Sequence, residues 1–399
     1  MMDDYLISVL MVNYNHENTI EATIRSVLNQ TYKNIQFVIV DDGSTDNSND
    51  IVKSFKDERI ELYSLGKNEH ICYATNYGFE RVKGKYLARI DSDDIWYPDF
   101  LEKQMIFMKQ KSECRICFTW CDWIDEEDNN INHLVPEWLR LCDVKFNSQK
   151  EWLKQFYFEG NCLMHSAVVM ETELMREIGS FEPAYRQLHD FDYWVRIAKR
   201  YNIYIIPERL ACIRKFRTGS DNASAPTKTN TIRTFNEYMD IRAAMFDDMS
   251  DETFIEAFGD QFVCSDSMSE EELKCEKAFM LCKPQRGWDG IPPEGIRRLK
   301  SLFESSRSKA LLEDKYHFSI QDLYELTSAH IYSDPVLKEE YNTYIRELNE
   351  RLEATNNEKQ NLEKEVLGLN AQISVYQNST SWKVTRPLRF VGKMLRGRE

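Results

Sequence analysis

The chain of 399 residues lacks several features that would assign it to common classes of protein. It has no apolar run near the ~18 residues that a membrane-spanning helix needs. Its first four residues, Met-Met-Asp-Asp, lack the positive charge that opens a secretory signal. With only 14 Gly and 10 Pro, it is neither collagen-like nor of low complexity. We therefore expect a folded protein that stays in the cytoplasm.

An excess of basic charge and the common catalytic motifs are also missing. Asp and Glu total 66 against 51 Lys and Arg, a net charge of -15, which excludes a general nucleic-acid-binding protein. No Walker A, G-x-G-x-x-G or G-x-S-x-G sequence occurs, so phosphate-loop, dinucleotide-binding and serine-hydrolase functions are not supported. The ten cysteines are widely spaced, and the only C-x-x-C runs from Cys114 to Cys117. We interpret it as part of a core strand with reduced thiols, in preference to a metal or redox site.

The sequence does contain an alternation of short apolar runs and helical patterns up to about residue 225. Continuous apolar runs, typical of strands buried on both faces, occupy residues 6–12, 35–40, 60–63 and 86–90. Helices are predicted between them, one with inward-facing Ile20, Ile24, Val27 and Leu28, and one across residues 73–82. This order predicts an α/β domain with a mostly parallel sheet covered by helices. In such sheets ligands bind beyond the carboxyl ends of the strands.

Carboxylates follow two of these predicted strands. Asp42 ends the second strand, although a turn before Gly43 would explain it equally well. Asp91, Asp93 and Asp94 follow the fourth strand within four residues. Their mutual repulsion favours a bound divalent cation, which would also take substrate phosphates.

The chain after residue 225 changes character in three steps. Residues 226–335 are rich in helix signals and show no recognisable chemistry. Residues 336–378 carry a heptad whose ten core positions are Ile345, Leu348, Leu352, Thr355, Lys359, Leu362, Val366, Leu369, Ile373 and Tyr376. This pattern predicts self-association through a coiled coil, with a single long helix folded back on the protein as the alternative.

Residues 379–399 form a basic tail within the acidic chain. From residue 380 to the end there are six basic side chains and one acidic one. Leu388, Val391 and Leu395 would share one face of a helix that has Pro387 in its first turn. An amphipathic helix on an anionic membrane surface is predicted. A solvated tail, or one that docks on the acidic part of the protein, is the alternative.

Several ordered motifs in the first 220 residues resemble one known family. They are residues 7–15 (ISVLMVNYN), 24–32 (IRSVLNQTY), 38–46 (VIVDDGSTD), 91–94 (DSDD) with Pro98, 165–166 (HS), 178–181 (IGSF) and 189–196 (HDFDYWVR). Together they resemble the family 2 glycosyltransferases with the GT-A fold, of the type that builds bacterial surface polysaccharides. The resemblance implies an inverting transfer of a sugar from a nucleotide-diphosphate donor, such as a UDP- or dTDP-sugar, to a hydroxyl of a glycan or lipid-linked acceptor.

The resemblance also implies roles for individual residues. Asp190 would be the catalytic base. Nucleotide contacts would come from Val12, Tyr14, Asp42, Asn76 and Asp91. A Mg or Mn ion would be bound by Asp91 and Asp93, with Asp94 as an alternative. The acceptor or a phosphate would contact His189, Trp194, and Arg214 or Arg217.

Three positions depart from the family pattern. His189 stands where Glu is usual, Thr75 stands before Asn76 where Arg is usual, and Cys72 occupies a stretch that is usually richer in Gly. The residues His189 and Asp190 could also simply begin a helix. An alternative function is a transferase-like scaffold without catalysis, which recruits assembly partners through the coiled coil. The leading prediction is an enzyme bound peripherally to the inner face of the cell membrane.

Overall fold

The computed structural model describes residues 5–216, 225, 227–283, 291–329 and 335–396. The chain divides into two compact units, residues 1–332 and 333–399, which are described separately. Among the described residues, no helix is both long enough and apolar enough to cross a membrane. The predicted domain boundary at residue 225 stays a prediction.

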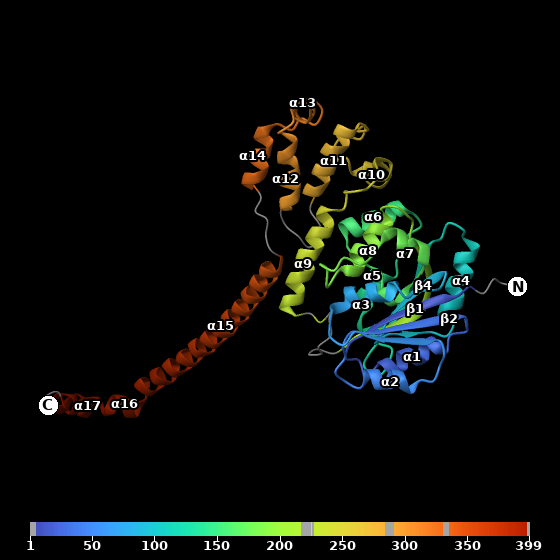
Figure 1. The fold of residues 1–399 in the computed structure, drawn as a ribbon. Helices are drawn as coiled ribbons and strands as arrows, with labels where there is room; N and C mark the ends of the chain where they lie inside the picture. The colour runs from blue at the N-terminus through green and yellow to red at the C-terminus, as the bar shows by residue number, and fades with distance from the viewer. Residues whose placement is uncertain (1–4, 217–224, 226, 284–290, 330–334, 397–399) are drawn as a thin grey trace. The chain divides into compact units, whose positions relative to one another are not determined.

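The first unit is built on one sheet of eight strands (Figure 1). The strands are β1 (Ile7–Asn13), β2 (Ile35–Asp41), β3 (Ile60–Ser64), β4 (Tyr86–Asp91), β5 (Ile95–Trp96), β6 (Ile116–Ile124), β7 (Val168–Glu171) and β8 (Tyr204–Arg214). Their order is β3-β2-β1-β4-β7-β6-β8-β5. All four predicted strands are present, and the mostly parallel GT-A-like α/β fold is confirmed.

The parallel register of β1, β2 and β4 aligns the carboxyl ends of these strands. Asn13 lies opposite Asp41, and Val12 lies opposite Asp91. Beyond β4 the direction reverses, because β7 pairs antiparallel to both β4 and β6. β8 runs parallel to β6, so that Arg214 pairs with the last residue of β6. The strand-end carboxylates therefore meet at one edge of the sheet.

Helices cover both faces of this sheet. In Figure 1, α1 and α2 lie below the strands, and α6, α7 and α8 lie above them. The helices of this part are α1 (Ile20–Leu28), α2 (Ser48–Ser54), α3 (His70–Phe79), α4 (Phe100–Gln110), α5 (Pro136–Cys142), α6 (Gln149–Phe158), α7 (Thr172–Ile178) and α8 (His189–Ala198), with short 3₁₀ turns at Asn132–Leu134 and His165–Ala167. The prediction of a helix over 73–82 was shifted by three residues. Val82 is buried although it follows the helix, so its apolar side chain resembled a further helical turn.

The predicted core strand around the C-x-x-C sequence is also confirmed. Cys117 lies in β6, and both Cys114 and Cys117 are buried free thiols. Burial raises the pKa of Cys117 well above its usual range, as expected of a thiol in an apolar core.

Helices continue the first unit after β8. They are α9 (Lys228–Ala243), α10 (Asp251–Phe258), α11 (Glu270–Cys282), α12 (Pro293–Leu302), α13 (Ser306–Asp314) and α14 (Ile320–Ala329), with a 3₁₀ turn at Gly259–Gln261. Ile241 and Phe254 join the main hydrophobic core, whereas Cys275, Leu299 and Leu312 form a second, smaller one. The region thus extends the core of the sheet-containing part and adds a small core of its own.

The second unit consists of α15 (Pro335–Asn378), α16 (Thr380–Val384) and α17 (Arg386–Arg396). α15 is one continuous helix of 44 residues, about 66 Å long at 1.5 Å per residue. Its predicted heptad residues are exposed, from 40% at Ile345 to 71% at Tyr376. The helix is therefore present, and the coiled coil stays a prediction. As expected, Pro387 lies in the first turn of α17.

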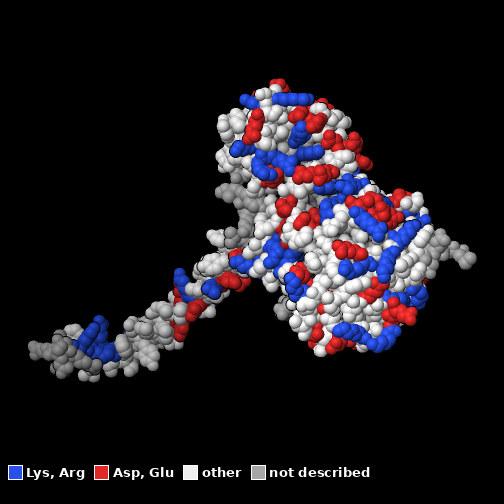
Figure 2. Space-filling view, in the orientation of Figure 1, with Lys and Arg blue, Asp and Glu red and all other residues white. Residues whose placement is uncertain are grey.

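Charge is distributed differently over the described surface of the two units. Acidic and basic side chains are interspersed on the visible face of the first unit, whereas basic side chains gather on the terminal helices (Figure 2). The side chain of Leu395 and residues 397–399 lie outside the described part.

Candidate active site

Asp42 sits just beyond β2, where the predicted nucleotide pocket lies. Its Oδ1 accepts a hydrogen bond from the Glu69 N–H at 2.7 Å, and the residue is only 2% exposed. Burial raises the pKa of Asp42, although backbone hydrogen bonds from Glu69 and His70 oppose that rise. Tyr14, which follows β1, is 42% exposed and available to a ligand. Val12 is a buried strand residue, so it can offer a ligand its backbone at most.

Asp91 ends β4 and is held by a buried arginine. The Arg89 guanidinium lies 3.0 Å from the Asp91 carboxylate, and the Asp91 N–H donates to Ser166 Oγ at 2.9 Å. The Asp91 side chain remains 36% exposed, so its carboxylate is open to a ligand. Burial raises the pKa of Asp91, but the positive charge of Arg89 and the neighbouring His165, His189 and His16 together outweigh this effect and keep the pKa below the usual range. Asp91 is therefore a charged carboxylate at the mouth of the site.

Asp94 is the structural member of the acidic run. It is 4% exposed, it accepts a short hydrogen bond from the Ser166 hydroxyl, and it accepts another from the Arg214 N–H at 2.9 Å. Burial, together with the charges of Asp93 and Asp91, raises its pKa well above the usual range. The position of Asp94 as an alternative metal ligand does not fit this geometry, because both of its oxygens already accept hydrogen bonds.

Arg214, like Asp94, has a structural role inside the protein. Its guanidinium is 1% exposed and donates to the Asp93 carbonyl at 2.7 Å, to the Asp125 carbonyl at 2.6 Å and to the Asp128 carboxylate at 2.6 Å. The prediction that Arg214 contacts a phosphate or the acceptor is wrong for this arrangement, since its donors are used within the protein. Arg217, the other candidate, lies outside the described residues.

Asp93 and Asp91 are the carboxylates that fit a divalent cation. The Asp93 carboxylate accepts no hydrogen bond from another described residue, and burial together with the charge of Asp91 raises its pKa to about 6. Within the described ranges, no group of three His, Cys, Asp or Glu side chains forms a complete metal cage. Mg²⁺ is typically bound by one or two carboxylates together with substrate phosphates, so this open pair suits it.

Asp190 lies at the start of α8. Its Oδ2 accepts from Asn161 Nδ2 at 3.1 Å and its Oδ1 from the Phe191 N–H at 2.7 Å. Burial raises the pKa of Asp190; His189 lowers it, and the negative charge of Asp91 raises it again. The ring of His189, the residue before Asp190, lies 5.6 Å from that of His165, and the next residue, Ser166, accepts from the Asp91 N–H, so the start of α8 lies near the end of β4. A carboxylate with a raised pKa in such a place is suited to accept a proton.

His189 lies beside Asp190, in a cluster of rings. Its ring centroid is 5.6 Å from those of His165 and Phe181, and Nδ1 lies 3.3 Å from the Arg186 carbonyl. Burial and the charge of Arg89 hold the pKa of His165 well below its usual range. His189 stands at the position where the family pattern has Glu, so Asp190 has no second carboxylate next to it in the chain.

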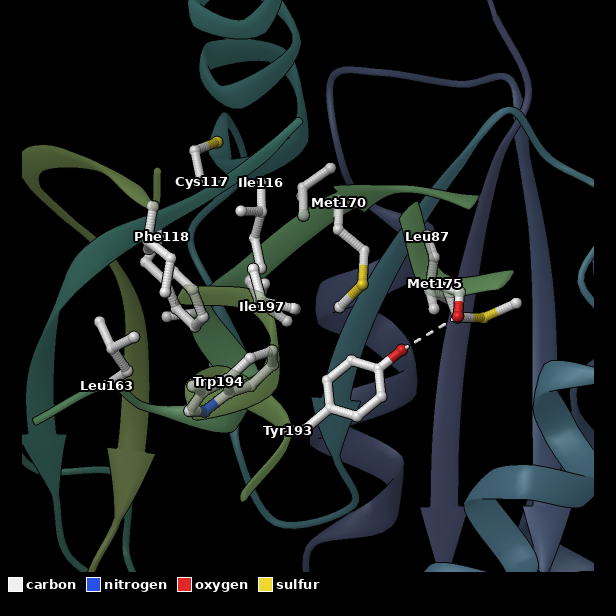
Figure 3. Close-up of a cluster of buried hydrophobic side chains, with 14 of the residues drawn as sticks. Leu87, Ile116, Cys117, Phe118, Leu163, Met170, Met175, Tyr193, Trp194 and Ile197 are labelled. Carbon is white, nitrogen blue, oxygen red and sulfur yellow. Dashed lines mark hydrogen bonds between the residues drawn. The ribbon is translucent and has the colours of Figure 1, made fainter. Parts of the chain in front are cut away.

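Trp194 lies in the hydrophobic core. It is fully buried and packs edge-to-face against Phe118, with ring centroids 5.0 Å apart. Figure 3 shows it among apolar side chains of the sheet and of α8, beside Tyr193, whose hydroxyl donates to the Met175 carbonyl at 3.3 Å. The prediction that Trp194 contacts the acceptor is wrong, because its position on α8 points inward.

Asn76 also has a structural role. Its Nδ2 donates to the Phe181 carbonyl at 2.9 Å, and its Oδ1 accepts from the Phe181 N–H at 2.8 Å. This two-way pair holds α3 to the loop after α7. The predicted contact of Asn76 with a nucleotide stays a prediction, because each end of the amide uses only one of its two hydrogen-bonding positions in this pair.

Three contributing residues were not singled out from the sequence. Arg89 forms an ion pair with Asp91. The Ser166 hydroxyl accepts from the Asp91 N–H and donates to the Asp94 carboxylate, and the Asn161 side chain donates to Asp190. Arg89 occupies an interior strand position, where a charge needs a partner, and that partner could have been sought two residues on. Ser166 stood in the His165-Ser166 motif, which did not indicate its contacts, and Asn161 carried no signal, because both approach the site only through folding.

Comparison with known proteins assigns the chain to a family. The family model described as glycosyl transferase family 2 matches residues 8–172. The chain is 30% identical over 246 residues to a putative teichuronic acid biosynthesis glycosyltransferase, TuaG of Bacillus subtilis, covering 60% of this chain and 90% of that protein. The chain is a family 2 glycosyltransferase.

Other relatives of this glycosyltransferase have related names. It is 32% identical over 224 residues to the UDP-Glc:alpha-D-GlcNAc-diphosphoundecaprenol beta-1,3-glucosyltransferase WfgD of Escherichia coli, covering 56% of this chain and 81% of that protein. Among solved structures, S. aureus TarS 1-349 in complex with UDP-GlcNAc superimposes with a TM-score of 0.51 at 17% identity, over 80% of this chain and 89% of that one. This likeness supports the GT-A fold. Asp190 lies beyond residue 172, where the family model ends.

Proposed function

We propose that this glycosyltransferase moves a sugar, with inversion, from a UDP- or dTDP-sugar to a hydroxyl of a lipid-linked glycan during surface polysaccharide synthesis. Its similarity to WfgD, whose name specifies a UDP-Glc donor and a diphosphoundecaprenol-linked acceptor, supports this choice. The observation that carries the proposal is the parallel register of β1, β2 and β4, which brings Asp42, Asp91 and Asp93 to one edge of a GT-A sheet, with the start of α8 and its Asp190 nearby.

Donor binding follows from the strand-end residues. Asp42 accepts a hydrogen bond from the nucleotide base, and the exposed Tyr14 ring lies at the end of the neighbouring strand. Asp91 and Asp93 would hold a Mg or Mn ion, which would stabilise the negative charge of the leaving diphosphate. The Arg89 guanidinium, 3.0 Å from the Asp91 carboxylate, favours the ionised form of Asp91 that such an ion needs.

Asp190 acts as the general base. Its carboxylate takes the proton of the acceptor hydroxyl as that oxygen attacks the anomeric carbon from the face opposite the diphosphate, which inverts the configuration. Asn161 holds the second carboxylate oxygen and so orients the base. His189 borders the same space and contributes to acceptor binding.

A mass-spectrometric screen of nucleotide sugars with lipid-linked acceptors tests this proposal. We expect one UDP- or dTDP-sugar to be transferred, with loss of activity on chelation and in Asp93→Ala. The matched control is Asp50→Ala, because Asp50 is 83% exposed on α2 and should be dispensable. A wild-type protein that is inert with every donor and acceptor would favour the scaffold function.

We further propose that α15 pairs with a second copy of the chain. Its exposed heptad residues lie every three to four residues along one stripe, as in Ile345, Leu348 and Leu352. Such a stripe is the seam of a coiled coil. A monomer at micromolar concentration by analytical ultracentrifugation would contradict this part of the proposal.

We also propose that α17 lies on the anionic inner surface of the cell membrane. At 100° per residue, Leu388, Phe390 and Val391 fall on one side of the helix, and Arg389 and Lys393 fall on the other. The three apolar residues are 54–74% exposed. The arrangement suits an interfacial helix that combines apolar insertion with attraction to anionic lipid.

A further inference from the structure

The loop that leads into α8 is held by a side chain of α9. Glu237 is 7% exposed. Its Oε1 accepts from the Arg186 N–H at 2.8 Å, and its Oε2 accepts from the N–H groups of Gln187 and Leu188 at 2.8 and 2.7 Å. Three consecutive backbone amides therefore point at one carboxylate, immediately before the helix that carries Asp190.

α9 contacts the same segment on both sides of Asp190. One turn after Glu237, Asp240 accepts from the Tyr185 hydroxyl at 2.6 Å. Tyr238 stacks on Phe191, with ring centroids 5.5 Å apart and planes inclined by 10°. α9 therefore contacts this segment both before and after Asp190.

The chemistry of this contact suits a carboxylate and no other side chain. Among the described residues, no Lys or Arg forms an ion pair with Glu237, so the three amides are what balances its buried charge. Hydrogen bonds to an ionised acceptor are stronger than neutral ones. Leu188, the N-cap of α8, gives the helix no side-chain cap, and negative charge near a helix N-terminus is favourable.

We propose that Glu237 is a positioning residue for the transfer reaction: by binding the 186–188 amides it sets the direction in which the chain enters α8, and hence where the Asp190 carboxylate lies. The inference rests on the proposed role of Asp190 as base. It gives a catalytic purpose to α9, in a region whose sequence shows no chemistry. A displacement of about 1 Å at a reacting group can cost roughly 100-fold in rate.

Glu237→Gln is the direct test, with the transferred sugar and its nucleotide donor as substrates. Gln has one acceptor oxygen in place of two, so at least one amide loses its partner. We expect kcat to fall about 10- to 100-fold. The donor KM should stay within about twofold, because Asp42 and Asp91 lie on other elements and Glu237 contacts neither. Amide hydrogen exchange at residues 186–188 should rise.

Glu276→Gln is the matched control. Glu276 is also a buried carboxylate that accepts from backbone amides, those of Val263 and Cys264 at 2.8 and 2.9 Å, but it lies in the helical region away from Asp190. Its variant should lower the unfolding temperature and leave kcat per folded molecule unchanged. An equal fall of kcat in both variants would reduce Glu237 to a structural residue and overturn the inference.

Glu237→Asp keeps the test decisive if the Gln variant does not fold. It retains both oxygens on a shorter side chain, so kcat and amide protection should both fall between the wild-type and Gln values. Wild-type kcat despite lost protection at 186–188, in either variant, would contradict the inference. If Asp190→Asn also kept its turnover, the proposed function itself would fail; if Asp190→Asn were inactive, only the role of Glu237 would fall.

Discussion

The two units of this glycosyltransferase differ in how far their apolar side chains are buried. In the first unit, strands such as β1 and β2 bury every residue, and the charged groups at their ends are held by specific partners. In the second unit, the apolar residues of α15 and α17 are exposed, and Leu388 reaches 74%. The first unit therefore has buried, fixed geometry around its candidate site, and the second has exposed apolar surface for which we have proposed a second copy of the chain and a membrane as partners. Four predictions follow this contrast, from the largest effect on turnover to the smallest.

Low pH should abolish turnover through the first unit. Asp190 must be ionised to accept a proton, and burial raises its pKa above the usual range. As pH falls through that raised value, Asp190 becomes protonated, and kcat should drop about tenfold per pH unit. The pH profile of kcat at saturating donor and acceptor measures this. A kcat that stays constant down to the ordinary range of an exposed Asp would contradict the assignment.

Ser166→Ala should weaken both folding and turnover. The hydroxyl is 1% exposed and serves the Asp91 N–H and the Asp94 carboxylate at once. Its removal leaves buried polar groups without a partner and should cost about 2 kcal/mol in the free energy of unfolding. Urea denaturation checks this value. The control is Ser54→Ala on the exposed surface of α2, which should unfold like the wild type; equal stability of the Ser166 variant would rule out the bridging role.

Leu362→Asp should dissociate the proposed pair of chains into monomers without slowing sugar transfer to a soluble acceptor. Leu362 occupies a core position of the heptad and is 55% exposed in the single chain. Leu367→Asp is the matched control, because Leu367 is 69% exposed on the same helix but lies outside the heptad core. Sedimentation should show a smaller species for the first variant alone. The same mass for both variants would contradict pairing through this stripe.

Leu388→Glu should release the protein from anionic vesicles and leave kcat on a soluble acceptor unchanged. A carboxylate on the apolar face of α17 opposes both insertion and attraction to anionic lipid. Ser381→Glu adds the same charge to exposed α16 and should retain more of the binding. Vesicle co-sedimentation is the measurement. If both variants lost vesicle binding equally, the added negative charge alone would explain the loss, and the role of the apolar face would be contradicted.

The fold and the strand-end carboxylates could be predicted because their signals are local. Continuous apolar runs mark buried strands, and Asp42, Asp91 and Asp93 follow them directly. Trp194 and Arg214 were placed in the site by their sequence neighbourhood. A helix turns each residue by 100°, which directs Trp194 of α8 into the core, whereas Arg214, at the end of strand β8, is buried with its donors used inside the protein.

The supporting contacts could not be predicted, since they join distant parts of the chain. Asn161 reaches Asp190 across 29 residues, and Glu237 reaches Leu188 across 49. Nothing in the spacing of these residues indicates the contact. In the second unit the heptad and the basic amphipathic pattern are visible in the sequence, and the partners that we propose for them are other molecules.

The central claim, that catalysis depends on the Asp190 carboxylate in a preformed nucleotide site, is tested most directly by Asp190→Asn. Turnover of the identified nucleotide sugar and the affinity for its nucleotide would be measured on the same preparation. We predict that kcat falls about 10²- to 10⁴-fold while nucleotide affinity stays within about threefold of the wild type. Wild-type turnover in Asp190→Asn would contradict the account.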